Sequence, residues 1–164
     1  MPRRHPETPT AWLITDPRLD AELLAIIRRL PRGSGVLVRH HHLGPGERAR
    51  LLRRIRRGAA GRQLVVVDET QGRTARVHSA REIARARLQG ARWLLVSPVF
   101  PTRSHPDWRP LPRMKAAALV RLAGHAAVAL GGMDVHRFRQ VAPLGFAGWA
   151  GIDGWPMRKK PSGK

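Results

Sequence analysis

Residues 127–134 read Ala-Val-Ala-Leu-Gly-Gly-Met-Asp, and this stretch indicates the fold class of the chain. The four apolar residues at its start form a continuous run, which is typical of a strand buried on both faces in a parallel sheet. Asp134 is a favourable helix N-cap, and Val135, Phe138 and Ala142 follow it at helical spacing until Pro143. A strand that turns through glycines directly into a helix is the repeating unit of a parallel α/β fold.

The same unit recurs along the chain. Other apolar runs that predict strands lie at residues 12–14, 36–38, 64–67, 93–96 and 148–152. Helical stripes lie between most of these runs, at residues 19–30, 48–57, 79–88 and 114–122. One joint is short, because only about ten residues separate Asp68 from Ser79. A parallel crossover takes roughly a dozen residues or more, so this joint has room for a short strand near residues 75–77 but not for a helix.

The chain is predicted to hold a single domain over residues 11–156, since 164 residues are enough for one hydrophobic core. Residues 1–10 are polar and rich in proline, so we expect a flexible N-terminus. Residues 157–164 are basic and contain proline and glycine, so we expect a disordered tail. The chain has no cysteine, no apolar signal region and no apolar run near the roughly 20 residues of a membrane helix. A cytoplasmic protein without membrane contact is therefore expected.

The charge of the chain is strongly positive, because 31 Lys and Arg stand against 11 Asp and Glu for a net charge of +20. Such a surface attracts polyanions, so a nucleic-acid-binding protein is one interpretation, with the arginine-rich helix at residues 48–57 as its interface. The alternative is a coding bias that writes arginine for lysine, with this helix as a solvated outer face. The arginines are spread along the chain, which favours the alternative. Aromatic residues make up only 5%, so the chain offers few side chains on which the bases of a single strand could stack.

Polar residues and glycines gather where the predicted strands end. They are Asp16, Arg39 to His42, Asp68, Glu69, His78, Ser97, Thr102 to His105, Gly131, Gly132 and Gly151 to Asp153. Ligands of parallel α/β folds bind at the carboxyl ends of the strands. The sequence therefore predicts a binding site at this end, with a phosphorylated small molecule as its ligand.

The pair Gly131-Gly132 is the main basis for predicting phosphate. Glycine lets backbone N–H groups approach an anion closely, and a helix N-terminus follows directly. An ordinary turn between strand and helix also needs glycine, so the pair alone does not separate the two explanations. The second segment, Gly151-Ile152, favours phosphate because barrels typically bind it with the loops after their last two strands.

Three features bear on metal binding and on anion binding. His40 to His42 are consecutive, and successive side chains of a strand point to opposite faces, so they converge on one ion only if the chain turns. A corner in which Arg39 and one or more of these histidines bind an anion is favoured instead. Asp68 ends a buried strand and is either a Mg²⁺ ligand or a cap for the next turn. His78 is either a site residue or a satisfied polar residue.

At these residues the chain resembles the thiamine phosphate synthase family, which also includes the thiazole tautomerases. Residues 97–106, Ser-Pro-Val-Phe-Pro-Thr-Arg-Ser-His-Pro, resemble the family's loop that closes on the thiazole phosphate. Residues 129–133 and 148–152 resemble its two phosphate-binding strand ends. The likeness spans about residues 11–155 and is looser upstream, at Leu13 to Asp16, Val38-Arg39, Val67-Asp68 and His78-Ser79.

The resemblance implies a TIM-type (β/α) barrel that is shortened by about one βα unit. It also implies a transferase of thiamine biosynthesis, which joins hydroxymethylpyrimidine pyrophosphate to thiazole phosphate and releases pyrophosphate. In this interpretation Arg39 and His41 act on the pyrophosphate, and Asp68 holds Mg²⁺. The implied substrate-binding residues are His78, Thr102, Ser104, His105, Gly131, Gly132, Gly151 and Ile152.

The chain also departs from the family pattern. Residues at family positions that differ are Leu37 for glutamine, Val67 for asparagine, and His41 and His105 for lysines. The short joint after Asp68 removes the second acidic Mg²⁺ ligand. A second interpretation is therefore a non-catalytic relative that binds a phosphorylated thiazole or thiamine phosphate. A seven-stranded barrel, or one completed by a partner chain in a homodimer, would accommodate the missing unit. Ser97-Pro98 stands where the tautomerases tend to have a histidine, which disfavours that activity.

Overall fold

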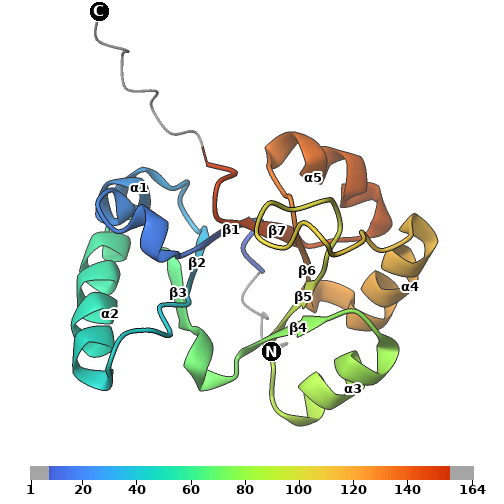
Figure 1. The fold of residues 1–164 in the computed structure, drawn as a ribbon, viewed down its shortest axis with the longest axis horizontal. Helices are drawn as coiled ribbons and strands as arrows, with labels where there is room; N and C mark the ends of the chain where they lie inside the picture. Colours follow the sequence, from blue (N-terminus) through green and yellow to red (C-terminus); the bar gives the residue numbers. More distant parts are fainter. Residues whose placement is uncertain (1–7, 156–164) are drawn as a thin grey trace, which may run out of the picture.

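The computed structural model describes residues 8–155 and contains, within them, a sheet of seven parallel strands (Figure 1). The strands are β1 (Ala11–Ile14), β2 (Gly35–Val38), β3 (Val65–Asp68), β4 (Thr74–Val77), β5 (Trp93–Val96), β6 (Ala127–Leu130) and β7 (Gly148–Gly151). Their order in the sheet is β3-β2-β1-β7-β6-β5-β4, and every neighbouring pair is parallel. The α/β prediction is confirmed.

Within the described residues, five α-helices cover the outer face of the curved sheet. They are α1 (Leu23–Arg29), α2 (Pro45–Ala60), α3 (Ala80–Leu88), α4 (Arg113–Ala123) and α5 (Val135–Val141). In Figure 1, α1 and α2 lie on one side of the molecule and α3, α4 and α5 on the other. Two predicted caps are present, because Ser79 Oγ accepts from Glu82 N and Asp134 Oδ1 accepts from Arg137 N. The side chains of Arg50, Arg53, Arg54, Arg56 and Arg57 on α2 are exposed, whereas that of Arg48 is buried.

The strands carry two apolar layers because successive side chains point to opposite faces. The outer layer packs the sheet against the helices. The inner layer fills the inside of the curl, and its buried residues are Trp12, Ile14, Leu37, Val67, Trp93, Leu95, Val128 and Ala150. Trp12 meets Trp93 edge to face across this interior, at 5.0 Å between ring centroids. Gly35 beside Trp12 leaves the space for the indole, since a Cβ there would overlap the ring.

The short joint lies between β3 and β4. Only the 3-10 turn η2 (Glu69–Gln71) connects these strands, and no helix intervenes. β3 and β4 stand at opposite ends of the strand order and do not pair with each other. The structure is therefore a curled sheet that lacks one βα unit, as the family resemblance implied, and it stays open between β3 and β4.

Residues 8–10 contact the domain, because Thr8 Oγ1 donates to His125 O and Trp12 Nε1 donates to Pro9 O. The rest of the predicted flexible N-terminus, and the predicted basic tail at 157–164, lie outside the described residues. Within residues 8–155, no helix is both long enough and apolar enough to cross a membrane.

Candidate functional site

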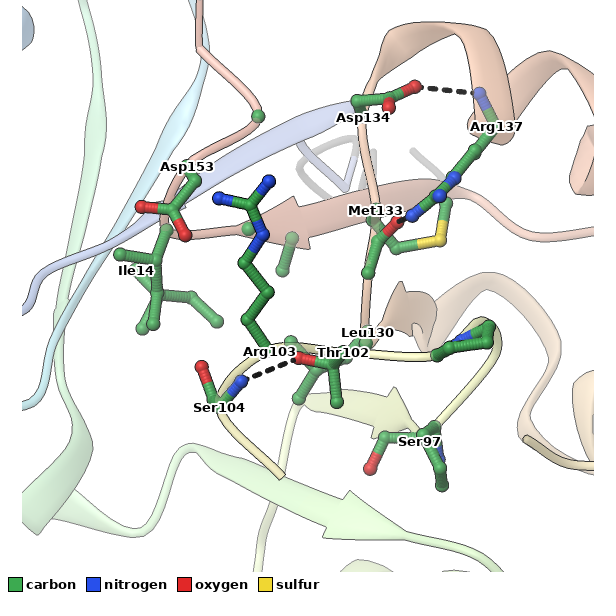
Figure 2. A pocket seen from close by; sticks show the side chains of 18 of the residues that line it. Ile14, Ser97, Thr102, Arg103, Ser104, Leu130, Met133, Asp134, Arg137 and Asp153 are labelled. Atoms are coloured by element: carbon green, nitrogen blue, oxygen red, sulfur yellow. Dashed lines mark hydrogen bonds between the residues drawn. The ribbon is translucent and has the colours of Figure 1, made fainter. Parts of the chain in front are cut away.

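A pocket of about 950 Å³ opens at the carboxyl ends of the strands (Figure 2). Its walls come from the segments that follow β2, β5, β6 and β7, together with Ile14 of β1 and Arg76 of β4. This is the end of the sheet at which the sequence predicts a ligand, because the polar residues and glycines that follow the strands gather there.

Most of the predicted site residues lie together in this pocket. Those that line it are Arg39, Thr102, Ser104, His105, Gly131, Gly132, Gly151 and Ile152. His41, Asp68 and His78 are not among its lining residues. The structure thus brings together the predicted phosphate-binding turns, the loop after β5 and one predicted catalytic arginine.

The two predicted glycine turns lie side by side. Gly131 and Gly132 adopt φ values of +98° and +58°, which favour glycine. The carbonyl oxygen of Met133 packs against the turn after β7, since a Cβ on Gly154 would lie only 2.6 Å from it. Backbone from the ends of β6 and β7 therefore forms one continuous wall of the pocket.

The loop after β5 packs directly on the first glycine turn. Val99 N donates to Leu130 O at 2.9 Å, and Phe100 N donates to Gly131 O at 3.1 Å. A Cβ on Gly132 would overlap the carbonyl oxygen of Pro101. The close approach of this loop is therefore a structural reason for glycine at positions 131 and 132, apart from any role in binding phosphate.

Replacing Gly132 by alanine is expected to lower the free energy of unfolding by about 1–3 kcal/mol, because a side chain is strained at positive φ and would displace Pro101. Urea unfolding measures the loss. Gly46→Ala is the matched control, since Gly46 lies in α2 with open space around it and should tolerate alanine. Equal stability of the two variants would contradict the packing described for Gly132.

The rest of the loop after β5 borders the mouth of the pocket. Thr102 Oγ1 accepts from Ser104 N at 3.3 Å, as Figure 2 shows. The His105 ring stacks on Trp108 with 4.3 Å between ring centroids. Two hydroxyl-bearing residues and an aromatic stack therefore line this side of the pocket.

Arg39 is held by a buried network at the end of β2. Its backbone N–H donates to Thr15 Oγ1 at 3.0 Å, and Thr15 Oγ1 also pairs with His40 Nδ1 at 2.9 Å. His40 Nε2 in turn lies 2.7 Å from Asp20 Oδ1. The Arg39 Nε atom is buried and makes no hydrogen bond, although Glu69 Oε2 lies 3.4 Å away. The Nε atom therefore forms an ion pair with Glu69 that lacks hydrogen-bond geometry, and the Arg39 side chain lines the pocket, where its positive charge favours an anion.

The three consecutive histidines do not converge on one point. His40 is buried between Thr15 and Asp20, whereas the exposed His41 pairs through Nε2 with Glu69 Oε2 at 2.5 Å. His78 is also exposed, and its backbone N–H and ring both pair with Glu82 at the start of α3. Among residues 8–155, no group of three or more His, Asp or Glu side chains could hold a metal ion.

Asp68 does not fit the Mg²⁺ ion that the family resemblance implies. Val67 belongs to the inner layer, so Asp68 points to the opposite face of the sheet, toward α2. There Asp68 Oδ1 accepts from Arg48 Nη2 at 2.5 Å, from Arg48 Nε at 3.2 Å, and from the backbone and hydroxyl of Thr70. Arg48 is fixed by further bonds to the carbonyl oxygens of Val38 and His40. The cation beside this carboxylate is therefore a guanidinium.

These contacts also determine the charge state of Asp68. Burial raises its pKa, but the hydrogen bonds from Arg48 and Thr70 outweigh burial and hold the pKa below its usual value. Asp68 is the N-cap of η2. Of the two roles predicted for it, Mg²⁺ ligand or cap of the next turn, the structure shows the cap.

Two arginines of the pocket, Arg76 and Arg137, were not identified as candidate site residues from the sequence. Ser97 and Arg103 were noted among the polar residues that follow the strands, but no role was assigned to them. Ser97 Oγ is buried without a hydrogen-bond partner among residues 8–155, and Figure 2 shows Arg103 extending into the pocket. Arg137 donates to Gly132 O and its guanidinium lies 5.4 Å from the Phe100 ring centroid. No clear signal in the sequence identifies Arg76, because its place on the inner face follows from its register with the inner-layer residue Leu95.

The comparisons with known proteins agree with this architecture. Solved structures similar to this chain include a thiamine phosphate pyrophosphorylase from Pyrococcus furiosus, with a TM-score of 0.74, 21% identity, and coverage of 90% of this chain and 87% of that one. Another is a thiamine phosphate pyrophosphorylase from Bacteroides thetaiotaomicron, with a TM-score of 0.56, 14% identity, and coverage of 88% and 82%. At these identities the likeness shows the fold. No curated protein sequence matches the chain significantly.

The family comparison concerns the half of the chain that contributes most of the pocket. The family model described as thiamine monophosphate synthase matches residues 72–154, which include the loop after β5 and both glycine turns. Since this match covers just over half of the 164 residues, the chain belongs to the thiamine monophosphate synthase family.

Proposed function

We propose that this protein joins hydroxymethylpyrimidine pyrophosphate to thiazole phosphate and so makes thiamine phosphate. The observation that supports this most is the shared pocket. Arg39, the hydroxyl-bearing loop at Thr102 and Ser104, and the two glycine turns all face one space of about 950 Å³. A pocket of this size is large enough for a ligand of drug-like dimensions, for which about 300–1,000 Å³ is typical.

Each wall of the pocket has a distinct task in this proposal. The thiazole phosphate lies against the backbone of Gly131, Gly132, Gly151 and Ile152, where glycine permits close approach of N–H groups to an anion. Thr102 and Ser104 contact the thiazole, with His105 beside them. Arg39 lies across the pocket and binds the pyrophosphate of the second substrate. The predicted roles of His41 and His78 stay predictions, since both side chains lie outside the pocket lining.

The reaction needs positioning and charge stabilisation more than covalent help from the protein. The bond between the pyrimidine methylene carbon and the pyrophosphate oxygen breaks, and its electron pair leaves with the pyrophosphate. The lone pair of the thiazole nitrogen then forms the new bond to that carbon. The Arg39 guanidinium, which lines the pocket, is suited to stabilise the negative charge that grows on the departing group.

An end-point assay tests the proposal. Purified protein is incubated with both substrates, with and without Mg²⁺, and thiamine phosphate is read after oxidation to fluorescent thiochrome. Product above a control without protein is expected. Absence of product from folded protein under both metal conditions would overturn the synthase proposal.

One observation favours a second candidate, a relative that binds thiazole phosphate or thiamine phosphate without catalysis. Asp68, the predicted Mg²⁺ ligand, is occupied by Arg48 on the far side of the sheet. A calorimetric titration with thiazole phosphate distinguishes this candidate, which predicts binding but no thiochrome signal.

A further inference from the structure

We propose that Arg76, together with Arg39, forms a two-guanidinium subsite that binds the pyrophosphate group without a divalent metal ion. The inference rests on the proposed function only for the identity of the anion as pyrophosphate. The presence of a site for a multiply charged anion rests on the residues alone.

The topology brings the two arginines to the same pocket from opposite sides of the open edge of the sheet. Arg39 follows β2, the neighbour of the edge strand β3, whereas Arg76 lies on the other edge strand, β4. Arg39 comes two residues after the inner-layer residue Leu37, and Arg76 pairs with the inner-layer residue Leu95. Both side chains therefore point into the curl, and both line the pocket.

The positive charges of Arg39 and Arg76 favour the binding of an anion between them. Burial and the nearby charge of Arg39 lower the pKa of Arg76. Both effects disfavour the charged form of Arg76, and a bound anion would offset them. Glu69 partly offsets this charge, but its carboxylate already pairs with His41 at 2.5 Å and lies 3.4 Å from Arg39. Within residues 8–155, Arg76 forms no salt bridge with a carboxylate. Two partly buried cations share one pocket, and one of them keeps a buried Nε without a hydrogen bond.

The two guanidinium groups line the pocket in which the pyrophosphate would bind, whereas the predicted Mg²⁺ ligand Asp68 points away from that pocket. Asp68 faces α2 and is held by Arg48 and Thr70. A pyrophosphate carries several charges and many acceptor oxygens, and arginine binds phosphate oxygens through two parallel N–H groups. Arg76 and Arg39 can each take one phosphate group in this way. Arg76 also lies 5.8 Å from the Trp108 ring centroid, which links it to the loop that borders the pocket.

Calorimetric titration with inorganic pyrophosphate tests this subsite. Wild-type protein is expected to bind pyrophosphate in the presence of EDTA, with no more than a twofold gain when excess Mg²⁺ replaces EDTA. Arg76→Gln should weaken this binding at least tenfold, since it removes a charged, forked donor. Arg76→Lys keeps the charge but loses the fork and should lie between the two. Arg81→Gln, an exposed arginine on α3 outside the pocket, removes the same charge and should bind like wild type.

Two outcomes would overturn the inference. One is pyrophosphate binding by wild-type protein that requires Mg²⁺, a result that needs no variant. The other is equal affinity in Arg76→Gln and Arg81→Gln. Thermal melting verifies folding, and Arg76→Gln should melt no lower than wild type because it relieves repulsion with Arg39.

The thiochrome assay separates this inference from the proposed function. Thiamine phosphate formation by a protein whose binding of pyrophosphate requires Mg²⁺ would leave the synthase proposal standing and refute the guanidinium pair. Metal-free pyrophosphate binding that depends on Arg76, in a protein that makes no product with or without Mg²⁺, would support the subsite and refute the synthase.

Discussion

Arg39→Ala is expected to lower the rate of thiamine phosphate formation by about a hundred- to a thousand-fold, the usual cost of removing one preorganised stabiliser of developing charge. The reason is local, because Arg39 lines the pocket and brings a guanidinium charge to it. The loss should appear mainly in kcat, since the negative charge on pyrophosphate is greatest in the transition state. Steady-state thiochrome kinetics measure it.

The control for this variant must separate lost chemistry from lost structure. The buried network uses the backbone N–H of Arg39, not its side chain, so Thr15 and His40 keep their bonds in Arg39→Ala. A melting temperature close to that of wild type is therefore expected. Arg81→Ala, outside the pocket, should keep full activity. Wild-type turnover in Arg39→Ala would refute the role assigned to this arginine.

Arg48→Met is expected to lower the free energy of unfolding by about 3 kcal/mol, because it leaves the carboxylate of Asp68 buried without its charged partner. It also removes the donor to the carbonyl oxygens of Val38 and His40. The double variant Arg48→Met/Asp68→Asn should recover part of the loss, since the amide oxygen can still accept from Thr70. Denaturant unfolding measures both variants. Arg50→Met, exposed on the same helix, is the control and should leave stability unchanged.

The same pair predicts how stability responds to pH. The pKa of Asp68 is lowered in the folded protein, so its contribution is fully present above the unfolded value, about 3.9. The contribution is lost as the pH falls through the lower folded value. The stability advantage of wild type over the double variant should therefore be constant from pH 7 to about pH 5 and shrink below pH 4. An advantage that did not change down to pH 2 would contradict the ion pair.

The local sequence pattern was enough to predict much of this fold. Apolar runs such as 127–130 and 93–96 are strands buried on both faces, and the joint after Asp68 is too short to hold a helix. The caps at Ser79 and Asp134 involve residues only three positions apart, so the sequence alone was enough to predict them. The gathering of Thr102, Gly131 and Gly151 at one end also followed, because every parallel strand ends there.

The direction in which a charged side chain points, by contrast, depends on contacts between residues far apart in the chain. Asp68 and Glu69 are neighbours in sequence, yet Asp68 turns outward to Arg48 of α2, and Glu69 pairs with His41 and lies near Arg39. Arg76 is one of 31 basic residues, and only its register with Leu95 places it inside the curl beside Arg39. Residue type and spacing thus determine which segments are strands, helices and turns, because those preferences act over a few residues. Which face a charged side chain takes, and which distant charge it meets, follows from strand register and helix packing, where the cost of burying an unpaired charge selects the arrangement.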